Sequence, residues 1–127
     1  MAGREFAVTL GLPPRALHPN SRPHHMAKAN AKKKYRAACR DATMIATNVD
    51  PPLLRKASIL FTFRFWRKHQ HDRDNLLAWI KSGIDGMADG GLVANDRDLT
   101  FLPIEVQYVP KTSILANTIL VNVMEIE

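Results

Sequence analysis

The amino-acid sequence predicts an α+β fold of two layers, in which one mixed, mainly antiparallel sheet packs against two helices. Three observations support this prediction. Four segments show the alternation or apolar content of strands, and two others repeat apolar residues at spacings of three and four, as helices do. These segments follow one another in the order β-α-β-α-β-β. The chain has 127 residues, enough for one modest core, so we expect a single domain over residues 1–127.

The first half of the chain predicts a strand, a loop and a helix. Residues 5–11 alternate as a strand should, and Pro13 and Pro14 end the pattern. Residues 13–28 contain prolines and histidines without a clear period, and we expect a long loop. Residues 30–48 are rich in alanine and predict a helix, whose apolar face comprises Tyr35, Ala38, Cys39, Ala42, Ile45 and Ala46.

The second half begins with the clearest strand, at residues 56–68. One face carries Ile59, Phe61, Phe63 and Phe65 and is expected to pack on the helices; the other keeps an aromatic among cations, with Arg64, Trp66 and Lys68. A helix then runs to about Ala88, with Asp74 or Asn75 as its N-cap and a buried face of Leu76, Leu77, Ile80, Ile84, Met87 and Ala88. Gly90 and Gly91 end it. Residues 104–109 and 114–124 predict two strands joined by a hairpin at 110–113.

Charge is distributed unevenly along the chain. The net charge is +6, but residues 1–70 carry 14 Lys and Arg against 3 Asp and Glu, whereas residues 71–127 carry 4 against 9. A basic half with a local concentration of aspartates is typical of a protein that binds a polyanion and also places carboxylates at one point. We therefore expect a nucleic-acid partner.

Other features exclude several classes of protein. No apolar run approaches the roughly 18 residues of a membrane span. Residues 1–5 lack the apolar core of a signal peptide, so we expect a cytoplasmic protein without a membrane partner. Cys39 is the single cysteine; it excludes an internal disulfide and is expected to be a small buried residue rather than a nucleophile. The sequence has no Walker loop, Rossmann fingerprint or HExxH motif.

Three aspartates are the first candidates for chemistry. Asp72 and Asp74 stand two residues apart at a strand-to-helix junction, and Asp96 follows the glycine break. Mg²⁺ prefers carboxylate oxygens, with substrate phosphate and water completing its coordination. The three carboxylates can therefore form a metal site if the chain returns after the break, although aspartate is also common at caps and turns. Asp98 is an alternative to Asp96.

Lys81 is the second candidate. Seven residues at about 100° each return to the same side of a helix, so Asp74, Ala78, Lys81 and Asp85 form one polar or small stripe. A lysine beside metal-binding carboxylates can neutralise charge that develops on a phosphate undergoing attack. The alternative is a solvated lysine paired with Asp85.

A basic tract in the first helix is the third candidate. Six cations fall within thirteen positions without an acid between them: Lys28, Lys32, Lys33, Lys34, Arg36 and Arg40. Phosphate contacts by such residues release counterions and make binding salt-dependent. The alternative is an ordinary charged helix surface.

Taken together, these residues resemble a known family. The segment Asp72-Arg73-Asp74-Asn75-Leu76, the later Asn95-Asp96 pair and the opening Leu12-Pro13-Pro14 with Asn20 downstream resemble the RusA family of Holliday junction resolvases. The resemblance covers nearly the whole chain, including the basic first helix.

The resemblance implies a homodimeric, Mg²⁺-dependent endodeoxyribonuclease, with Mn²⁺ as a substitute, that resolves four-way DNA junctions by paired symmetric nicks in recombination and repair. It implies a bacterial host and a phage or prophage gene, and no small-molecule cofactor. Asp72, Asp74 and Asp96 would be catalytic and bind the metal, and Asn75, His71 and Asn95 would support them. The expected DNA contacts are Lys32, Lys33, Lys34, Arg36, Arg40, Arg64, Arg67, Lys68 and Arg73.

One position departs from the family pattern. The best-known members have a catalytic lysine four residues after the second aspartate, and this chain has Ala78 there. Lys81, one turn further along the same stripe, is the candidate replacement. Two alternatives stay open, namely a nuclease that also cuts flaps and forks, and a junction-binding protein without catalysis.

Overall fold

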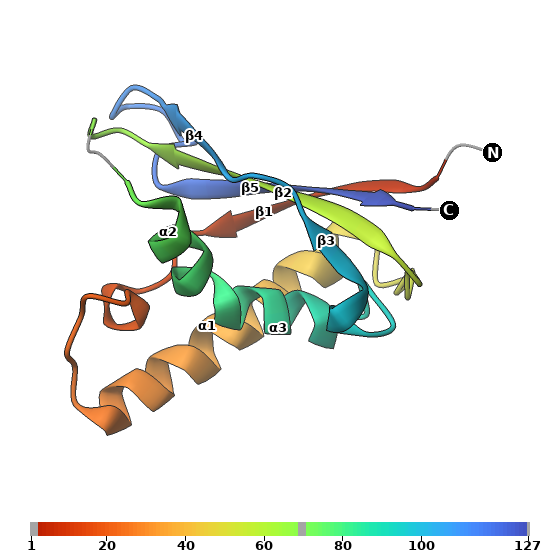
Figure 1. Ribbon diagram of the computed structural model, residues 1–127, viewed down its shortest axis with the longest axis horizontal. Helices are drawn as coiled ribbons and strands as arrows, with labels where there is room; N and C mark the ends of the chain where they lie inside the picture. The colour runs from red at the N-terminus through yellow and green to blue at the C-terminus, as the bar shows by residue number, and fades with distance from the viewer. Residues whose placement is uncertain (1–2, 69–70, 127) are drawn as a thin grey trace.

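The computed structural model describes residues 3–68 and 71–126, except for the side chain of Asp96. The strands form one layer and the helices cover one face of it (Figure 1). In chain order the elements are β1 (Glu5–Gly11), η1 (Arg15–Leu17), α1 (His25–Ala46), β2 (Ala57–Phe65), α2 (Arg73–Trp79), α3 (Lys81–Asp89), η2 (Asp96–Asp98), β3 (Leu99–Phe101), β4 (Glu105–Tyr108) and β5 (Thr118–Glu125). The predicted two-layer α+β class is confirmed.

The sheet is mixed, and β2 lies at its centre. β5 pairs antiparallel with both β1 and β2, while β3 and β4 pair parallel with successive parts of the other edge of β2. The predicted hairpin at residues 110–113 is therefore wrong, because β4 and β5 lie on opposite edges of β2. β3 was not predicted, since a segment of three residues is too short to show a period.

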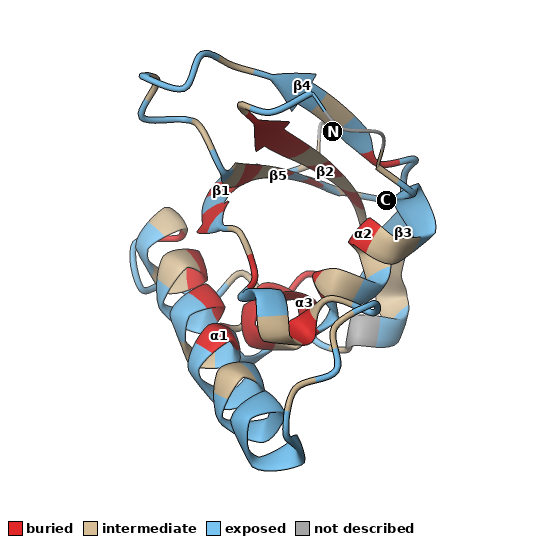
Figure 2. Cartoon of the chain, turned by 90° about the vertical axis from the view of Figure 1, so that its left-hand side faces the viewer, coloured by how far each residue is buried: buried red, intermediate tan, exposed pale blue. Residues whose placement is uncertain are grey.

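The predicted strand alternation is confirmed in β2. Ile59, Phe61 and Phe63 are fully buried, and Phe65 is nearly so. Side chains of β1 and β5 extend this apolar layer, namely Val8, Leu10, Ile119, Val121 and Val123. The opposite face of β2 differs from the prediction at Arg64, which is only 7% exposed. Figure 2 shows the buried residues gathered between the sheet and the helices.

Helix α1 begins five residues before the predicted start. His24 caps it, because its Nδ1 accepts a hydrogen bond of 3.2 Å from the Met26 backbone N–H. The inward face holds Tyr35, Cys39 and Thr43, with alanines beside them, whereas Ile45 is 77% exposed and Ala38 is also exposed, contrary to the prediction. None of the helices in the described residues is both long and apolar enough to cross a membrane.

The second predicted helix is divided in two at Ile80, whose φ of −84° and ψ of −3° separate α2 from α3. The predicted inward face is nevertheless retained, with Leu76, Ile80, Ile84 and Met87 buried and Leu77 and Ala88 half-buried. The N-cap is Asp72, two residues before the earlier of the two predicted positions, because its carboxylate accepts a hydrogen bond from the Asp74 N–H in the first turn of α2.

Two glycines allow α3 to lie close against α1. A Cβ at Gly86 would overlap the Arg36 carbonyl oxygen and lie 2.9 Å from the Cys39 Cβ, and a Cβ at Gly83 would lie 3.0 Å from the Tyr35 ring. Cys39 is buried at this crossing, as predicted, and burial raises the pKa of its thiol to about 11. The thiol is therefore protonated at neutral pH, which is the opposite of what a nucleophile needs.

Replacing Gly86 with alanine should destabilise the fold. The added methyl group has to displace the backbone of α1, and overpacking of this kind typically costs about 1–3 kcal/mol. Urea denaturation followed by circular dichroism measures the loss. Gly11→Ala is the matched control, because a Cβ there meets no atom within 4 Å. Equal stability of the two variants would contradict the close crossing of α1 and α3.

Candidate active site

The start of α2 carries two of the predicted carboxylates. Asp72 lies in extended conformation just before the helix, and its Oδ1 accepts a hydrogen bond of 2.9 Å from the Asp74 N–H. Both aspartates are exposed. Capping uses one carboxylate oxygen of Asp72, so its second oxygen and the whole carboxylate of Asp74 can face solvent or a ligand.

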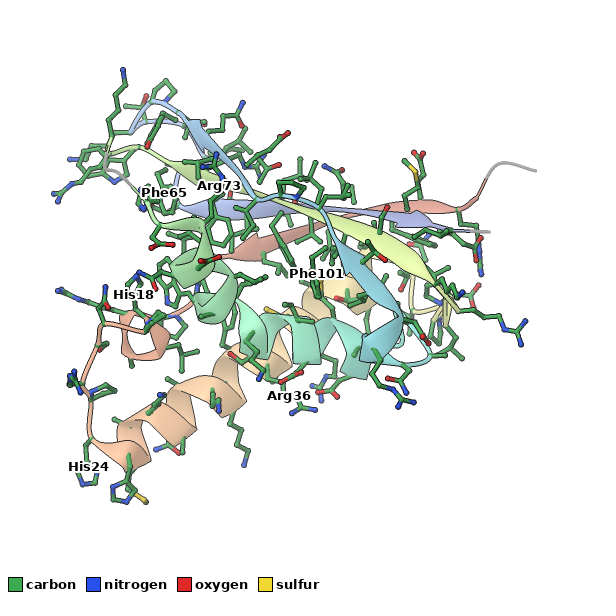
Figure 3. All side chains as sticks on the ribbon, viewed as in Figure 1. His18, His24, Arg36, Phe65, Arg73 and Phe101 are labelled. Atoms are coloured by element: carbon green, nitrogen blue, oxygen red, sulfur yellow. The ribbon has the colours of Figure 1, made fainter. Side chains whose placement is uncertain are left out.

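Asp74 lines a groove of about 500 Å³ together with Leu77, Ala78, Lys81, Ile84, Asp85 and Phe101, which we call the Asp74 groove. The predicted stripe of Asp74, Ala78, Lys81 and Asp85 is therefore confirmed as one surface, even though the helix is divided at Ile80. The apolar residues of the groove are Leu77 and Ala78 from α2, Ile84 from α3 and Phe101 from β3. Figure 3 shows Phe101 on β3 above α3.

Lys81 is the first residue of α3 and is exposed. Within the described residues its amine forms no ion pair with a carboxylate inside 4 Å, so the pairing with Asp85 that was the alternative for this lysine is not present. An ammonium group that shares a groove with Asp74, and that no described carboxylate holds in an ion pair, can turn toward a bound anion.

The segment carrying the third predicted carboxylate returns to α3 after the glycine break. Asp96 begins η2, which contacts α3. Asn95 Oδ1 accepts a hydrogen bond of 3.0 Å from the Arg97 N–H, and the Asn95 carbonyl accepts one of 3.1 Å from the Asp98 N–H. Asn95 therefore stabilises this turn. The side chain of Asp96, the third predicted carboxylate, lies outside the described residues.

The donor atoms at α2 suit a hard cation. Exposed carboxylates at positions 72 and 74 offer the oxygen ligands that Mg²⁺ prefers, and solvent access leaves room for water and phosphate. Among the described side chains, which leave out that of Asp96, no group of three or more His, Cys, Asp or Glu residues could hold a metal. A site here would therefore use Asp96 or oxygens of the substrate in addition to Asp72 and Asp74.

The basic tract on α1 is exposed, but two of its cations have partners within the protein. Arg36 forms an ion pair with Asp89 at the end of α3, with a distance of 2.9 Å from Nη2 to Oδ1, and Arg40 pairs with Asp41 at 3.1 Å. The hydrogen bonds from Arg36 lower the pKa of Asp89. Their stabilising contribution is therefore present above the ordinary pKa of aspartate and is lost as the pH falls through the lowered value. The exposed lysines of the tract are Lys28, Lys32, Lys33 and Lys34.

Among the other predicted DNA contacts, two arginines also form hydrogen bonds within the fold. Arg64 is buried and its Nε donates a hydrogen bond of 2.9 Å to Thr118 Oγ1. The Nε of Arg73 donates one of 2.8 Å to the Ile104 carbonyl, which fixes the start of α2 to the chain before β4. Arg67 and Lys68 follow β2 and are exposed. Of these four predicted contacts, Arg64 is buried, whereas Arg67, Lys68 and Arg73 are exposed.

A larger cleft, of about 870 Å³, lies between the loop after β1, the end of β2 and α2. We call it the tryptophan cleft, because both tryptophans of the chain line it: Trp66 after β2 and Trp79 at the end of α2. Arg15, His18, Arg22 and Arg67 are also part of its wall. Sequence reasoning predicted a long loop here and placed Trp66 among cations, but did not connect either to Trp79.

Two of the three predicted supporting residues, His71 and Asn75, lie around the start of α2, whereas Asn95 lies at the turn before η2. His71 is half-buried, lines the tryptophan cleft, and its ring stacks on Phe65 at 4.1 Å between centroids and 12° between planes. Asn75 is half-buried in the first turn of α2. The ring contact between His71 and Phe65 therefore holds the end of β2 against the segment that leads into Asp72. Asn75 follows Asp74 directly in the sequence.

The chain matches no model of a known protein family, and no curated protein is significantly similar to it in sequence.

Replacing Asp72 should separate its capping role from its charge. Asp72→Ala removes the acceptor for the Asp74 N–H, and loss of an N-cap typically costs about 1 kcal/mol. Asp72→Asn keeps a capping oxygen and should unfold at nearly the wild-type urea concentration. If both variants lost the same stability, the negative charge near the helix N-terminus, rather than the cap, would be responsible.

Proposed function

We propose that this protein is a metal-dependent endodeoxyribonuclease of the RusA type, which resolves four-way DNA junctions by paired nicks. The observation that carries the proposal is the pair of exposed carboxylates at the start of α2, in the Asp-x-Asp-Asn-Leu segment. The Asp74 groove adds a lysine to that acidic surface, and η2 brings the Asn95-Asp96 segment back to α3. These features support the proposal together with the spacing of the motif.

Each group has a defined part in the proposed reaction. Water attacks phosphorus as the bond to the 3′ oxygen breaks, so the products carry a 5′-phosphate and a 3′-hydroxyl. Asp72, Asp74 and Asp96 would hold Mg²⁺, which when bound polarises the phosphate and acidifies water. Lys81 faces the negative charge that grows on the phosphate oxygens, and the lysines of α1 hold the DNA backbone.

Paired nicks require two such sites. A four-way junction has two-fold symmetry, and a homodimer with a two-fold axis presents one site to each of two opposing strands. A phage or prophage enzyme of this kind would act on recombination intermediates in the bacterial cytoplasm. The proposal therefore includes a homodimer as the active species.

Asp74→Asn should abolish cutting of a labelled synthetic four-way junction in Mg²⁺, while a gel shift in EDTA stays within about twofold of wild type. The change removes a metal-binding charge but keeps the size of the side chain. Asp85→Asn is the matched control, because Asp85 lines the same groove but lies outside the metal-binding motif, and it should retain cutting.

A comparison of DNA substrates distinguishes a resolvase from a broader nuclease and from a junction-binding protein without catalysis. Paired symmetric nicks by wild type support a resolvase, and equal cutting of flaps and forks supports a broader nuclease. Junction that is bound but uncut by wild type in Mg²⁺ would refute the nuclease, and cutting by Asp74→Asn would refute the metal assignment.

Lys81→Ala should lower the single-turnover cutting rate at saturating protein by roughly 100-fold, the usual effect of removing one group that stabilises transition-state charge. Lys32→Ala is the control, because it removes an exposed cation from α1 without touching the groove. It should weaken junction binding and its salt dependence while leaving the saturated rate unchanged. An unaffected rate in Lys81→Ala would show that no lysine replaces the one expected at position 78.

A further inference from the structure

The tryptophan cleft is not explained by the proposed cutting reaction. Its wall includes His71 and Leu76 on one side of α2, whereas Asp74, Leu77 and Ala78 line the Asp74 groove on the other. The two hollows are therefore separated by the width of one helix. At about 870 Å³ the cleft lies within the size range of ligand-binding sites.

The loop that forms one wall is held in place by the rest of the fold. The hydroxyl of Tyr35 donates a hydrogen bond of 2.7 Å to the Gly11 carbonyl, and the indole N–H of Trp79 donates one of 2.9 Å to the Pro14 carbonyl. Leu17 is buried in the core, and His18 packs edge-on against Trp79 with 5.3 Å between ring centroids. The cleft is thus formed before any ligand binds, which lowers the entropic cost of binding.

The charges of the cleft suit an anion. Arg15, Arg22 and Arg67 come from both sides of it, and the described residues of its wall include no aspartate or glutamate. None of the three arginines forms an ion pair within the described part of the chain. Arginine presents a planar fork of N–H donors that matches phosphate oxygens.

The aromatic groups suit a base. Trp66 and Trp79 are both half-buried, so each shows part of its ring surface to the cleft. The guanidinium of Arg67 and the ammonium of Lys111 lie 4.7 Å and 4.9 Å from the Trp66 ring centre and help to fix its position. Aromatic rings beside cations are the usual means by which proteins hold single-stranded nucleic acid, because every base has a face that can stack.

We infer that the tryptophan cleft binds an unpaired nucleotide of the DNA strand, with the base against the tryptophans and its phosphates on the arginines. The inference rests on the proposed function, since it takes DNA as the substrate. A helix is roughly 10 Å across, and stacked nucleotides rise about 3.4 Å each, so the held base lies about three nucleotides from the scissile phosphate. Unpaired bases occur where a junction opens, so the cleft distinguishes branched DNA from continuous duplex.

Tryptophan fluorescence tests the inference directly, because the only two tryptophans of the chain both line the cleft. Full-length protein in EDTA is titrated with a thymidine tetranucleotide, with an abasic strand of the same length and charge, with duplex DNA and with thymidine monophosphate. The tetranucleotide should quench the emission. The abasic strand should bind roughly tenfold more weakly, since a stacked base contributes that much or more. Duplex should bind with little quenching.

Substitutions locate the binding. Arg22→Ala and Trp66→Leu should each weaken tetranucleotide binding, measured by anisotropy of a labelled strand, by roughly tenfold, and Trp66→Phe should restore most of the loss. Arg55→Ala is the control, because it removes an exposed arginine that does not line the cleft. Circular dichroism confirms that each variant is folded.

Three results would overturn the inference: equal affinity for the abasic strand, equal losses in Arg22→Ala and Arg55→Ala, or thymidine monophosphate binding as tightly as the tetranucleotide. The last result would mean a pocket for free nucleotides. Because these measurements exclude divalent metal, they are independent of cutting. A protein that passes them but leaves junctions uncut would lose the proposed function and keep the cleft.

Discussion

β2 is hydrogen-bonded along both edges, to β5 on one side and to β3 and β4 on the other, and its phenylalanine face is buried under the helices. A strand that pairs along both edges and must also bury one apolar face can do both in only one register. The chain leaving β2 must therefore emerge at one end of the sheet. Trp66 and Arg67 line the tryptophan cleft there, and Asp72 starts α2 a few residues later. The positions of the Asp74 groove and of the tryptophan cleft therefore both depend on where the chain leaves β2.

Helix α2 then separates two surfaces of opposite character. Asp74 faces the groove, while Leu76 and Trp79 face the cleft, because residues two and five positions further on lie on other sides of a helix. The carboxylate of Asp74 and the arginines of the cleft therefore lie on opposite sides of a single helix, within about one helix diameter of each other.

Periodic patterns of sufficient length could be predicted from the sequence, and interactions between distant segments could not. The phenylalanines of β2 and the stripe from Asp74 to Asp85 repeat over several turns or pleats, so their faces follow from spacing alone. The hairpin prediction failed because proximity in sequence does not reveal that β5 crosses to the other edge of β2. Gly86 and Trp79 show no pattern of their own; their roles depend on Arg36 and Pro14, residues 50 and 65 positions away.

The break at Ile80 bears on the lysine that the family pattern has four residues after the second aspartate and that this chain lacks. In an unbroken helix, Ala78 and Lys81 would be three residues apart and offset by about 60°. Here α2 ends before Lys81, yet both residues line the Asp74 groove. A lysine side chain is long and flexible, so its amine can reach a phosphate held at Asp74 from the start of α3. In the proposed reaction, the positive charge can therefore come from one turn further along the chain, provided that the two helices keep a common surface.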